Sequence, residues 1–277
     1  MIFYIIPTPI GNLDDLSNRS LKILSKLDFL VVENFSITRK LLNHYSINIQ
    51  NVITYNDHSN DHVRNKILDN VKKGLVGGLV SDSGTPLISD PGFKLIQTLA
   101  DNNINIVSIP GPSSVTSALA GSGLPTDSFQ FLGFFPRKDK DRKLIVKTIE
   151  RFAGTSIFFD SPKRLLKNLV WLQNNSDFNE SDISIAKEIS KLNEKFIRGK
   201  GSQVVEKITK INDFFKGEFV VLIKPIKKEE QELKLEQFYM YFSEFMPKKD
   251  LINAVHLITG ESKNKIYKLF LALASKD

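Results

Sequence analysis

The residues best suited to chemistry lie in a loop without large side chains before Thr85, Ser81-Asp82-Ser83-Gly84-Thr85-Pro86. An apolar run with β-branched residues, Leu75 to Val80, precedes the loop and predicts a buried strand. Asp82 and Thr85 offer polar groups to a ligand, and Gly84 lets a ligand approach the backbone closely. Because ligands bind at the carboxyl ends of strands in open α/β sheets, this loop is a candidate binding site. An ordinary βα turn would explain the loop if it stood alone.

Three further corners share this design. Strands predicted at 1–6, 104–109 and 155–159 end in short loops of small residues and proline, namely Pro7 to Asn12, Pro110 to Ser114 and Asp160 to Pro162. Ser113 and Ser114 place hydroxyls and backbone donors at a predicted helix N-terminus. The small residues of that helix suit either a flat ligand or tight packing on a sheet. Four such corners from both halves of the chain predict one cleft between the halves.

The elements that position these corners alternate between strand and helix. Apolar runs at 28–33 and 53–55 add strands to the first half, and helical periodicity separates them. This alternation predicts a largely parallel sheet with helices on its faces. We therefore expect an α/β fold with a first α/β domain at 1–122, a second at 123–226, and a small helical module at 233–277. A charged stretch without apolar period, 225–232, marks the boundary of the module.

The helical module has two possible roles. Its last two helices, joined by a short turn at Gly260, resemble a helix-turn-helix, and nearby lysines could contact phosphate: Lys248, Lys249, Lys263 and Lys265. Acidic residues nearly balance these charges. A packing or dimer-stabilising role therefore stays open.

Composition excludes several classes of protein. The chain has 277 residues, 41% of them hydrophobic, which is enough for real cores. A net charge of +7 weakly favours a polyanionic partner. The chain has no cysteines, which excludes disulfides and thiolate metal sites, and its 4 histidines lack the spacing of a zinc site. Without a long apolar run or a leader segment, we expect a soluble, cytoplasmic protein with no membrane contact.

Common nucleotide and hydrolase motifs are also missing. No G-x-G-x-x-G follows the first strand, and neither G-x-x-x-x-G-K-[ST] nor G-x-S-x-G occurs. Dinucleotide redox chemistry, P-loop hydrolysis and serine esterase chemistry therefore lose support.

Several multi-residue motifs, in order, resemble one known family. They are Pro7-Thr8-Pro9-Ile10-Gly11-Asn12-Leu13, Thr38-Arg39-Lys40-Leu41-Leu42, Ser81 to Pro86 with Ile88-Ser89-Asp90-Pro91-Gly92, Pro110-Gly111-Pro112-Ser113, Gly123-Leu124-Pro125-Thr126-Asp127, and Gly133-Phe134 with Pro136-Arg137-Lys138. Together they resemble the ribosomal small subunit methyltransferase I family of the tetrapyrrole methylase superfamily. The resemblance implies two α/β domains with S-adenosylmethionine between them, and a homodimer. It also implies methylation of the ribose 2′-oxygen of a cytidine in the decoding region of 16S rRNA in the 30S subunit.

The resemblance also implies site residues. We expect S-adenosylmethionine to lie against Ile10, Asp82, Gly84, Thr85, Ser113, Ser114, Val115, Phe159, Glu218 and Phe219. The catalytic candidates are Glu33 as a base or orienting group, Asn12 for the target ribose, and Arg39 and Lys40 for phosphate. Ordinary structural or surface roles would also explain these four residues.

The chain departs from the family pattern at two positions. Asn34-Phe35-Ser36 replaces an acidic residue and Thr-Arg after Glu33, which puts a second carboxylate beside Glu33 in doubt. Asp160 replaces the glutamate of Glu-Ser-Pro, which keeps the charge but shortens its reach.

Two alternative functions stay open at this stage. One is a tetrapyrrole or other small-molecule methylase of the same superfamily. The other is a non-catalytic RNA-binding or assembly protein on this scaffold. Cofactor binding would separate the last from both enzymes.

Overall fold

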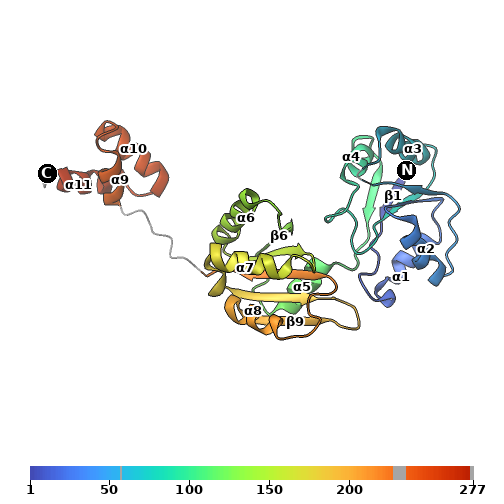
Figure 1. Ribbon diagram of the computed structural model, residues 1–277. Coiled ribbons are helices and arrows are strands. Elements are labelled where there is room, and N and C mark those ends of the chain that lie inside the picture. Colours follow the sequence, from blue (N-terminus) through green and yellow to red (C-terminus); the bar gives the residue numbers. More distant parts are fainter. Residues whose placement is uncertain (57, 227–234, 275–277) are drawn as a thin grey trace. The chain divides into compact units, whose positions relative to one another are not determined.

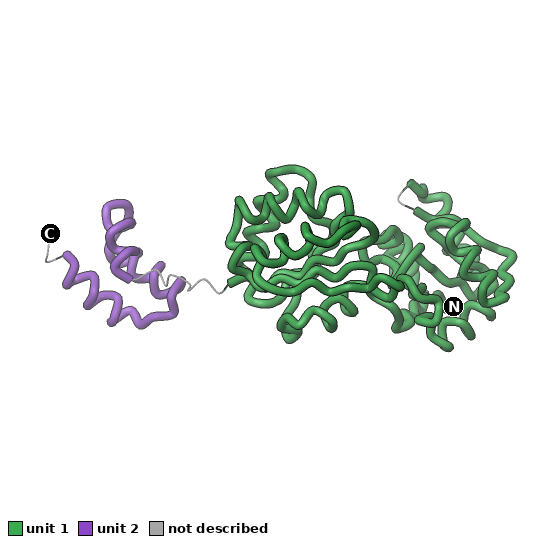
Figure 2. The backbone as a smooth tube through the Cα atoms, turned by 60° about the horizontal axis from the view of Figure 1, so that its bottom comes forward, with its two compact units in different colours: residues 1–226 green, residues 227–277 purple. Residues whose placement is uncertain are grey.

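A computed structural model describes residues 1–56, 58–226 and 235–274 (Figure 1). The chain forms two compact units, residues 1–226 and 227–277 (Figure 2). Most of the predicted charged boundary, 227–232, lies outside the described residues, as do 233–234 and 275–277 at the ends of the predicted module.

The first sheet is parallel throughout, with strand order β3-β2-β4-β1-β5. Its strands are β1 (Ile2–Ile5), β2 (Phe29–Val32), β3 (Val52–Thr54), β4 (Gly77–Val80) and β5 (Asn105–Ser108). β1 lies between β4 and β5, so the loops that follow these three strands leave the sheet side by side. The predicted parallel sheet is confirmed.

Helices cover both faces of this sheet. On one face, α1 (Asn18–Leu24) and α2 (Phe35–His44) bury Leu24 and Leu42 against Leu30 and Val32. On the other face, α3 (Asp61–Lys72) and α4 (Phe93–Asp101) contribute Ile67, Val71, Leu95 and Leu99 to a second core. Strands buried on both sides explain the continuous apolar runs in the sequence.

The second sheet is mixed, with strand order β6-β7-β10-β8-β9. Its strands are β6 (Phe129–Phe134), β7 (Thr155–Asp160), β8 (Asp182–Lys187), β9 (Lys195–Lys200) and β10 (Phe219–Lys224). β6 and β7 are parallel, and the other pairs are antiparallel. Because β7 and β10 are antiparallel, the end of β7 lies beside the start of β10, with Asp160 opposite Phe219.

One face of the second sheet packs on three helices and the other on one. The three are α6 (Asp139–Arg151), α7 (Leu165–Asn175) and α8 (Gly201–Thr209). The single helix is α5 (Ser114–Ser122), which packs Val115 and Leu119 against Val220 and Leu222. A Cβ atom on Gly121 would meet the Phe196 ring at 2.5 Å, so the small residues of α5 serve tight packing. α5 lies in the predicted first domain, 1–122, yet it packs against the second sheet. The domain boundary at 122 stays a prediction.

The second unit consists of α9 (Leu235–Phe242), α10 (Lys248–Thr259) and α11 (Lys263–Ala274). Its core holds Phe238, Leu251, Val255, Ile266 and Phe270. Among the described helices of the whole chain, none has the length and apolar character to span a membrane.

Candidate active site

Three loops of the first sheet are joined into one wall. Thr8 and Gly84 exchange backbone hydrogen bonds of 2.9 and 3.0 Å, which tie the loop after β1 to the loop after β4. The Thr85 hydroxyl donates to the Pro112 carbonyl at 2.9 Å, which ties the loop after β4 to the loop after β5. A Cβ atom on Gly111 would lie 2.7 Å from Pro7, so the first and third loops are also in contact. The corners predicted to converge are therefore held together.

The second sheet supplies the opposite wall. Phe159 lies near the end of β7, and Glu218-Phe219 begins β10. The Glu218 N–H donates to Glu188 Oε1 at 2.8 Å, and Lys191 Nζ lies 3.0 Å from Glu188 and 2.9 Å from Glu218. These contacts hold the start of β10 in place.

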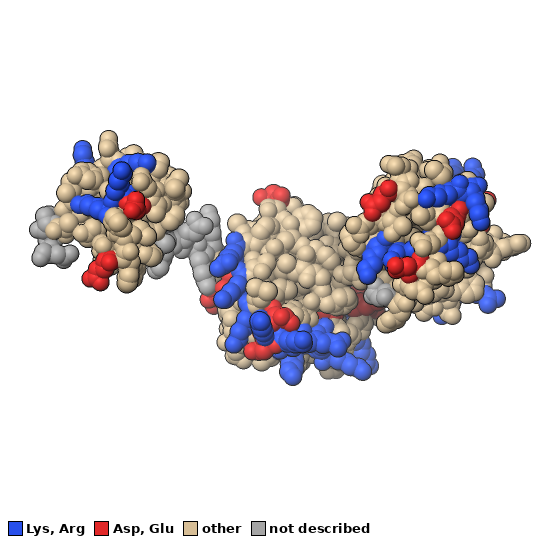
Figure 3. All heavy atoms as spheres, turned by 90° about the horizontal axis from the view of Figure 1, so that it is seen from above, with Lys and Arg blue, Asp and Glu red and all other residues tan. Residues whose placement is uncertain are grey.

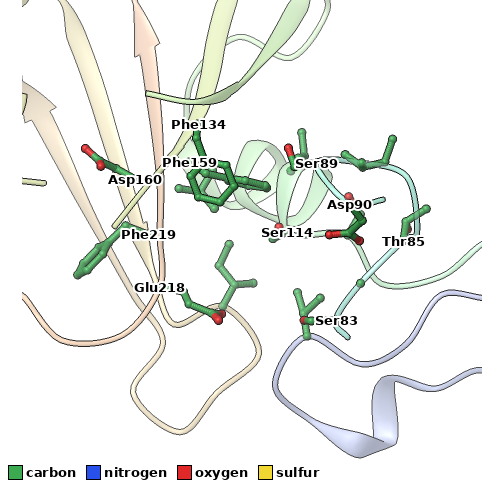
Figure 4. A pocket seen from close by; sticks show the side chains of 17 residues that line it. Ser83, Thr85, Ser89, Asp90, Ser114, Phe134, Phe159, Asp160, Glu218 and Phe219 are labelled. Atoms are coloured by element: carbon green, nitrogen blue, oxygen red, sulfur yellow. The ribbon is translucent and has the colours of Figure 1, made fainter. Parts of the chain in front are cut away.

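A cavity of about 270 Å³ lies between the two walls (Figure 4). All of the residues predicted to contact the methyl donor line it, except Asp82: Ile10, Gly84, Thr85, Ser113, Ser114, Val115, Phe159, Glu218 and Phe219. We call this space the donor cavity. The structure brings these residues together, while their individual roles stay predictions.

Asp82 lines a neighbouring cavity with Glu33, Asn34, Ser36, Thr54, Asn56 and His58 among its polar residues. We call this space the polar cavity. Burial raises the pKa of Asp82, and its Oδ1 atom has no hydrogen-bond partner among the described residues. The Asp82 N–H lies 3.4 Å from Glu33 Oε2, so the two residues are neighbours.

The other catalytic candidates lie apart from both cavities. Asn12 is exposed, and its side-chain oxygen accepts from the Asp14 N–H at 3.1 Å, capping a short 3-10 helix, η1 (Leu13–Asp15). Arg39 and Lys40 are exposed on α2, and neither is among the described residues that line the two cavities. These three residues therefore do not share the polar cavity with Glu33.

Several cavity residues were not predicted as site residues: Ser83, Ile88, Ser89, Asp90, Phe134, Asp160, Ile189 and Val220. Asp90 is the most consequential of them. Burial raises its pKa to about 6, the carboxylates of Glu33 and Asp82 act in the same direction, and a hydrogen bond with the Ser81 side chain opposes them. A signal was present in the sequence, because Ser89-Asp90-Pro91 belongs to a motif carrying the resemblance.

Asp160 is the second missed carboxylate, and its surroundings differ. Its side chain is 0% exposed and lies 3.4 Å from Arg164, and it accepts hydrogen bonds from the Ser161 N–H at 2.8 Å and from Asn168 Nδ2 at 2.7 Å. Burial raises its pKa, although these partners favour the ionised form. Pro162 ends the loop after β7 but does not begin the next helix. A turn closed by the Arg164 N–H to the Ser161 carbonyl comes first, and α7 begins at Leu165.

The donor cavity suits a ligand with a flat ring and an anionic group. Ser113, the N-cap residue of α5, makes no side-chain cap hydrogen bond within the described chain, so backbone N–H groups at this helix start can serve a ligand. Gly84 has φ +80°, and a Cβ atom there would lie 3.2 Å from Ile10. Ile10, Val115 and Phe159 provide apolar walls. In the described parts of the chain, no group of three or more His, Cys, Asp or Glu residues is placed to hold a metal ion.

Comparisons with known proteins agree with this architecture. The profile of the family Tetrapyrrole (Corrin/Porphyrin) Methylases matches residues 3–205. A Vibrio cholerae protein named Ribosomal RNA small subunit methyltransferase I is 36% identical over 272 residues, which cover 96% of this chain and 93% of the relative. A Hydrogenobaculum protein of the same name is 38% identical over 224 residues, covering 80% and 95%.

Solved structures show the same fold at low sequence identity. A diphthine synthase aligns with a TM-score of 0.64 at 14% identity, covering 81% of this chain and 90% of that chain. A cobalt precorrin-4 methyltransferase aligns with a TM-score of 0.58 at 17% identity, covering 80% and 94%.

Proposed function

The chain belongs to the ribosomal RNA small subunit methyltransferase I family of tetrapyrrole methylases, and from this premise we propose that it methylates the ribose 2′-oxygen of a cytidine in the decoding region of 16S rRNA. The single observation that carries the proposal is the donor cavity, where corners of both α/β halves meet. The two named relatives match at over 35% identity, across 93% and 95% of their own length.

The methyl donor of this superfamily is S-adenosylmethionine. Bound in the donor cavity, it would supply an electrophilic methyl group on a sulfonium. Ser114 and Val115 would offer backbone donors, Phe159 and Ile10 apolar contact, and Gly84 a close backbone approach. We keep Asp82 as a proposed contact because it directly precedes Ser83, which lines the donor cavity.

The ribose hydroxyl must lose its proton as its oxygen is methylated. Asp90 is placed to accept that proton, because its carboxyl group lines the donor cavity and is ionised above about pH 6. Glu33 and Asp82 can orient ribose hydroxyls from the polar cavity. Asn12 stays a proposed contact of the target ribose, and Arg39 and Lys40, exposed on α2, stay proposed phosphate contacts.

The partners follow from the same proposal. We propose that the substrate is 16S rRNA within the 30S subunit, that the enzyme is a homodimer, and that it acts in the cytoplasm. The net charge of +7 favours association with the phosphate backbone.

The proposal is tested by methyl transfer to 30S subunits from a strain lacking this gene. We expect label from the donor in 16S rRNA, at one ribose of the decoding region, found by mapping 2′-O-methylation. Transfer to a tetrapyrrole and not to 30S subunits would contradict the proposal and indicate a small-molecule methylase. Absence of donor binding would indicate an RNA-binding or assembly protein.

Calorimetry tests the proposed donor contacts directly. Asp82→Arg should abolish S-adenosylmethionine binding while leaving the circular dichroism spectrum unchanged, because the longer cation would reach into the adjoining donor cavity. Unchanged affinity would remove Asp82 from the set of donor contacts without affecting the transfer experiment.

A further inference from the structure

A solvent-exposed aromatic ring lies at the edge of the donor cavity. Phe134 ends β6, lines the cavity, and is 57% exposed (Figure 4). Its ring meets the ring of Phe159 edge-on, with 5.4 Å between centroids. Core packing does not account for a phenylalanine with more than half of its surface exposed.

A β-bulge turns Phe134 toward the cavity. The pairing of β6 with β7 shifts register between Phe131 and Phe134, and Gly133 inside the bulge has φ +68°. In a regular strand, residues three positions apart point to opposite faces, but here both rings contact Phe159, at 4.8 and 5.4 Å. Bulges of this kind re-aim side chains near active sites. The strand is therefore built to present this ring.

Two exposed basic residues, Arg137 and Lys138, follow the ring in the sequence. Neither forms an ion pair with a carboxylate in the described part of the chain, and α6 begins directly after them. On the face of the molecule shown in Figure 3, lysine and arginine side chains gather along one side of the second α/β half. An exposed ring at the donor cavity is thus followed, three and four residues later, by two exposed positive charges.

A buried network holds this loop in one position. The Arg142 side chain is buried, donates to the Pro136 carbonyl at 3.2 Å and to Asn168 Oδ1 at 2.9 Å, and lies over the rings of Phe135 and Trp171. Arg164 Nη1 donates to the Phe135 carbonyl at 3.2 Å. Asn168 also donates a hydrogen bond to Asp160, which lines the donor cavity. The ring and the basic pair are therefore anchored to the cavity wall.

We infer that Phe134 stacks on a base of the acceptor RNA at the mouth of the donor cavity, and that Arg137 and Lys138 bind the adjoining phosphates. The inference rests on the proposed function and assigns the surface that receives the substrate. Single-stranded RNA is recognised by stacking of unpaired bases on aromatic side chains beside cationic groups that contact the backbone. A rigid platform binds with a smaller loss of conformational entropy than a mobile one.

Base stacking is tested with an RNA oligonucleotide of the decoding region that carries 2-aminopurine beside the target nucleotide. Wild-type protein should quench its fluorescence. Phe134→Ala should abolish the quenching and weaken RNA binding about tenfold, because one stacked base is lost. Phe134→Tyr should restore both, and calorimetry should find that Phe134→Ala loses less affinity for S-adenosylmethionine than for the RNA. If Phe134→Ala weakens donor binding and leaves the quenching intact, the ring is a wall of the donor cavity and the inference is wrong.

The phosphate contacts are tested by salt dependence. Arg137→Ala with Lys138→Ala should lower the slope of log K against log salt concentration by about 1.4 for single-stranded RNA. The matched control is Lys147→Ala with Arg151→Ala, which removes the same charges about 13–20 Å further along α6. Equal slopes for the two double variants would show general attraction and overturn the assignment.

These readouts separate the inference from the proposed function. If 30S subunits are not methylated but the RNA binds through Phe134, the proposed reaction fails while the surface stands. If 30S subunits are methylated and every Phe134 variant quenches like wild type, the reaction stands and the surface fails.

Discussion

The two aspartates on opposite walls of the donor cavity have contrasting surroundings. Asp160, on the second sheet, is 0% exposed and satisfied by the Ser161 N–H, Asn168 and Arg164. Asp90, on the first half, is half-buried, bonds to the Ser81 hydroxyl, and faces the carboxylates of Glu33 and Asp82. Burial raises the pKa of both groups. A carboxylate surrounded by donors stabilises the fold, whereas one surrounded by other carboxylates exchanges its proton near neutral pH.

The backbone around Asp90 is strained, and that around Asp160 is not. Leu87 and Ser89 have φ of +76° and +68°, and Gly92, the N-cap of α4, has φ +128°. Left-handed conformations cost about 1 kcal/mol or more for a residue such as leucine. Strain of this kind persists where the surrounding structure enforces it, and it is concentrated at functional sites. The contrast supports the proposed role of Asp90 in the reaction and a structural role for Asp160.

The largest expected effect is on stability, from Asp160→Ala. This change would leave Arg164 without its ion-pair partner, Asn168 Nδ2 without its acceptor, and the nearby buried guanidinium of Arg142 without an opposite charge. The free energy of unfolding should therefore fall by about 3–5 kcal/mol. Urea unfolding followed by Trp171, the single tryptophan and a residue packed against the same network, measures it. Asp160→Asn keeps an acceptor and should lose less. A loss of stability below about 1 kcal/mol for Asp160→Ala would contradict a structural role for Asp160.

Asp90→Asn should act mainly on the reaction and should leave the protein folded. Loss of a general base should lower kcat for 30S methylation about a hundredfold. The affinity for S-adenosylmethionine, measured by calorimetry, should stay within about threefold of wild type, since the amide has the shape of the carboxyl group. Asp90→Glu, which keeps the proton acceptor, is the control and should recover part of the rate. An unchanged kcat for Asp90→Asn would show that positioning alone drives the transfer.

The dependence of kcat on pH distinguishes the roles of Asp90 and Asp160. Because a base acts in its ionised form and the pKa of Asp90 is raised to about 6, kcat should rise with pH through about 6 and level off above about 7. At pH 5 the rate should be about tenfold below the plateau. Asp160→Asn should keep this profile, whereas Asp90→Asn should flatten it. A wild-type profile that is flat between pH 5 and 7 would contradict the role of Asp90.

The sequence predicted the strands and the corners that follow them because glycine and proline mark turns in any context. The residues expected to contact the donor came from the family resemblance, and all of them except Asp82 line the donor cavity. Corners such as Gly84 and Ser113 follow recognisable strands, and the parallel order of those strands brings their loops to one edge. Asp90 was missed because its position in the cavity depends on the strained backbone of residues 87–92, which the sequence does not reveal.

Two other misses have different physical causes. Phe134 depends on a bulge, whose sequence signal is a single glycine. Arg142 lies in a stretch rich in lysine and arginine, residues 137–151, yet it is buried. A signal was present, since Arg142, Val146 and Ile149 are spaced i, i+4, i+7 and share the buried face of α6. Net charge over a segment cannot show which member of it is buried.

The smallest expected effect is a gain of stability in Asp90→Asn. The folded state holds the Asp90 pKa at about 6, above the ordinary value of 3.8, so it binds the proton more tightly than the unfolded chain does. The stability from this group is present at low pH and is lost as pH rises through about 6, because the folded state must then hold an ionised carboxylate. The amide carries no such cost. Since Asp90 is only half-buried, water screens the penalty, and the gain at pH 7.5 should be about 1 kcal/mol.

Urea unfolding of wild type and Asp90→Asn at two pH values measures this gain, and the difference between the curves should nearly vanish at pH 4. Asp160→Asn should show no such gain at pH 7.5, because it loses the charge that pairs with Arg164 and keeps only one of the two acceptor oxygens that bind the Ser161 N–H and Asn168. If both asparagine variants gained stability alike at pH 7.5, burial alone would set the behaviour of the two carboxylates. Their different neighbours would then not explain why one is structural and the other reactive.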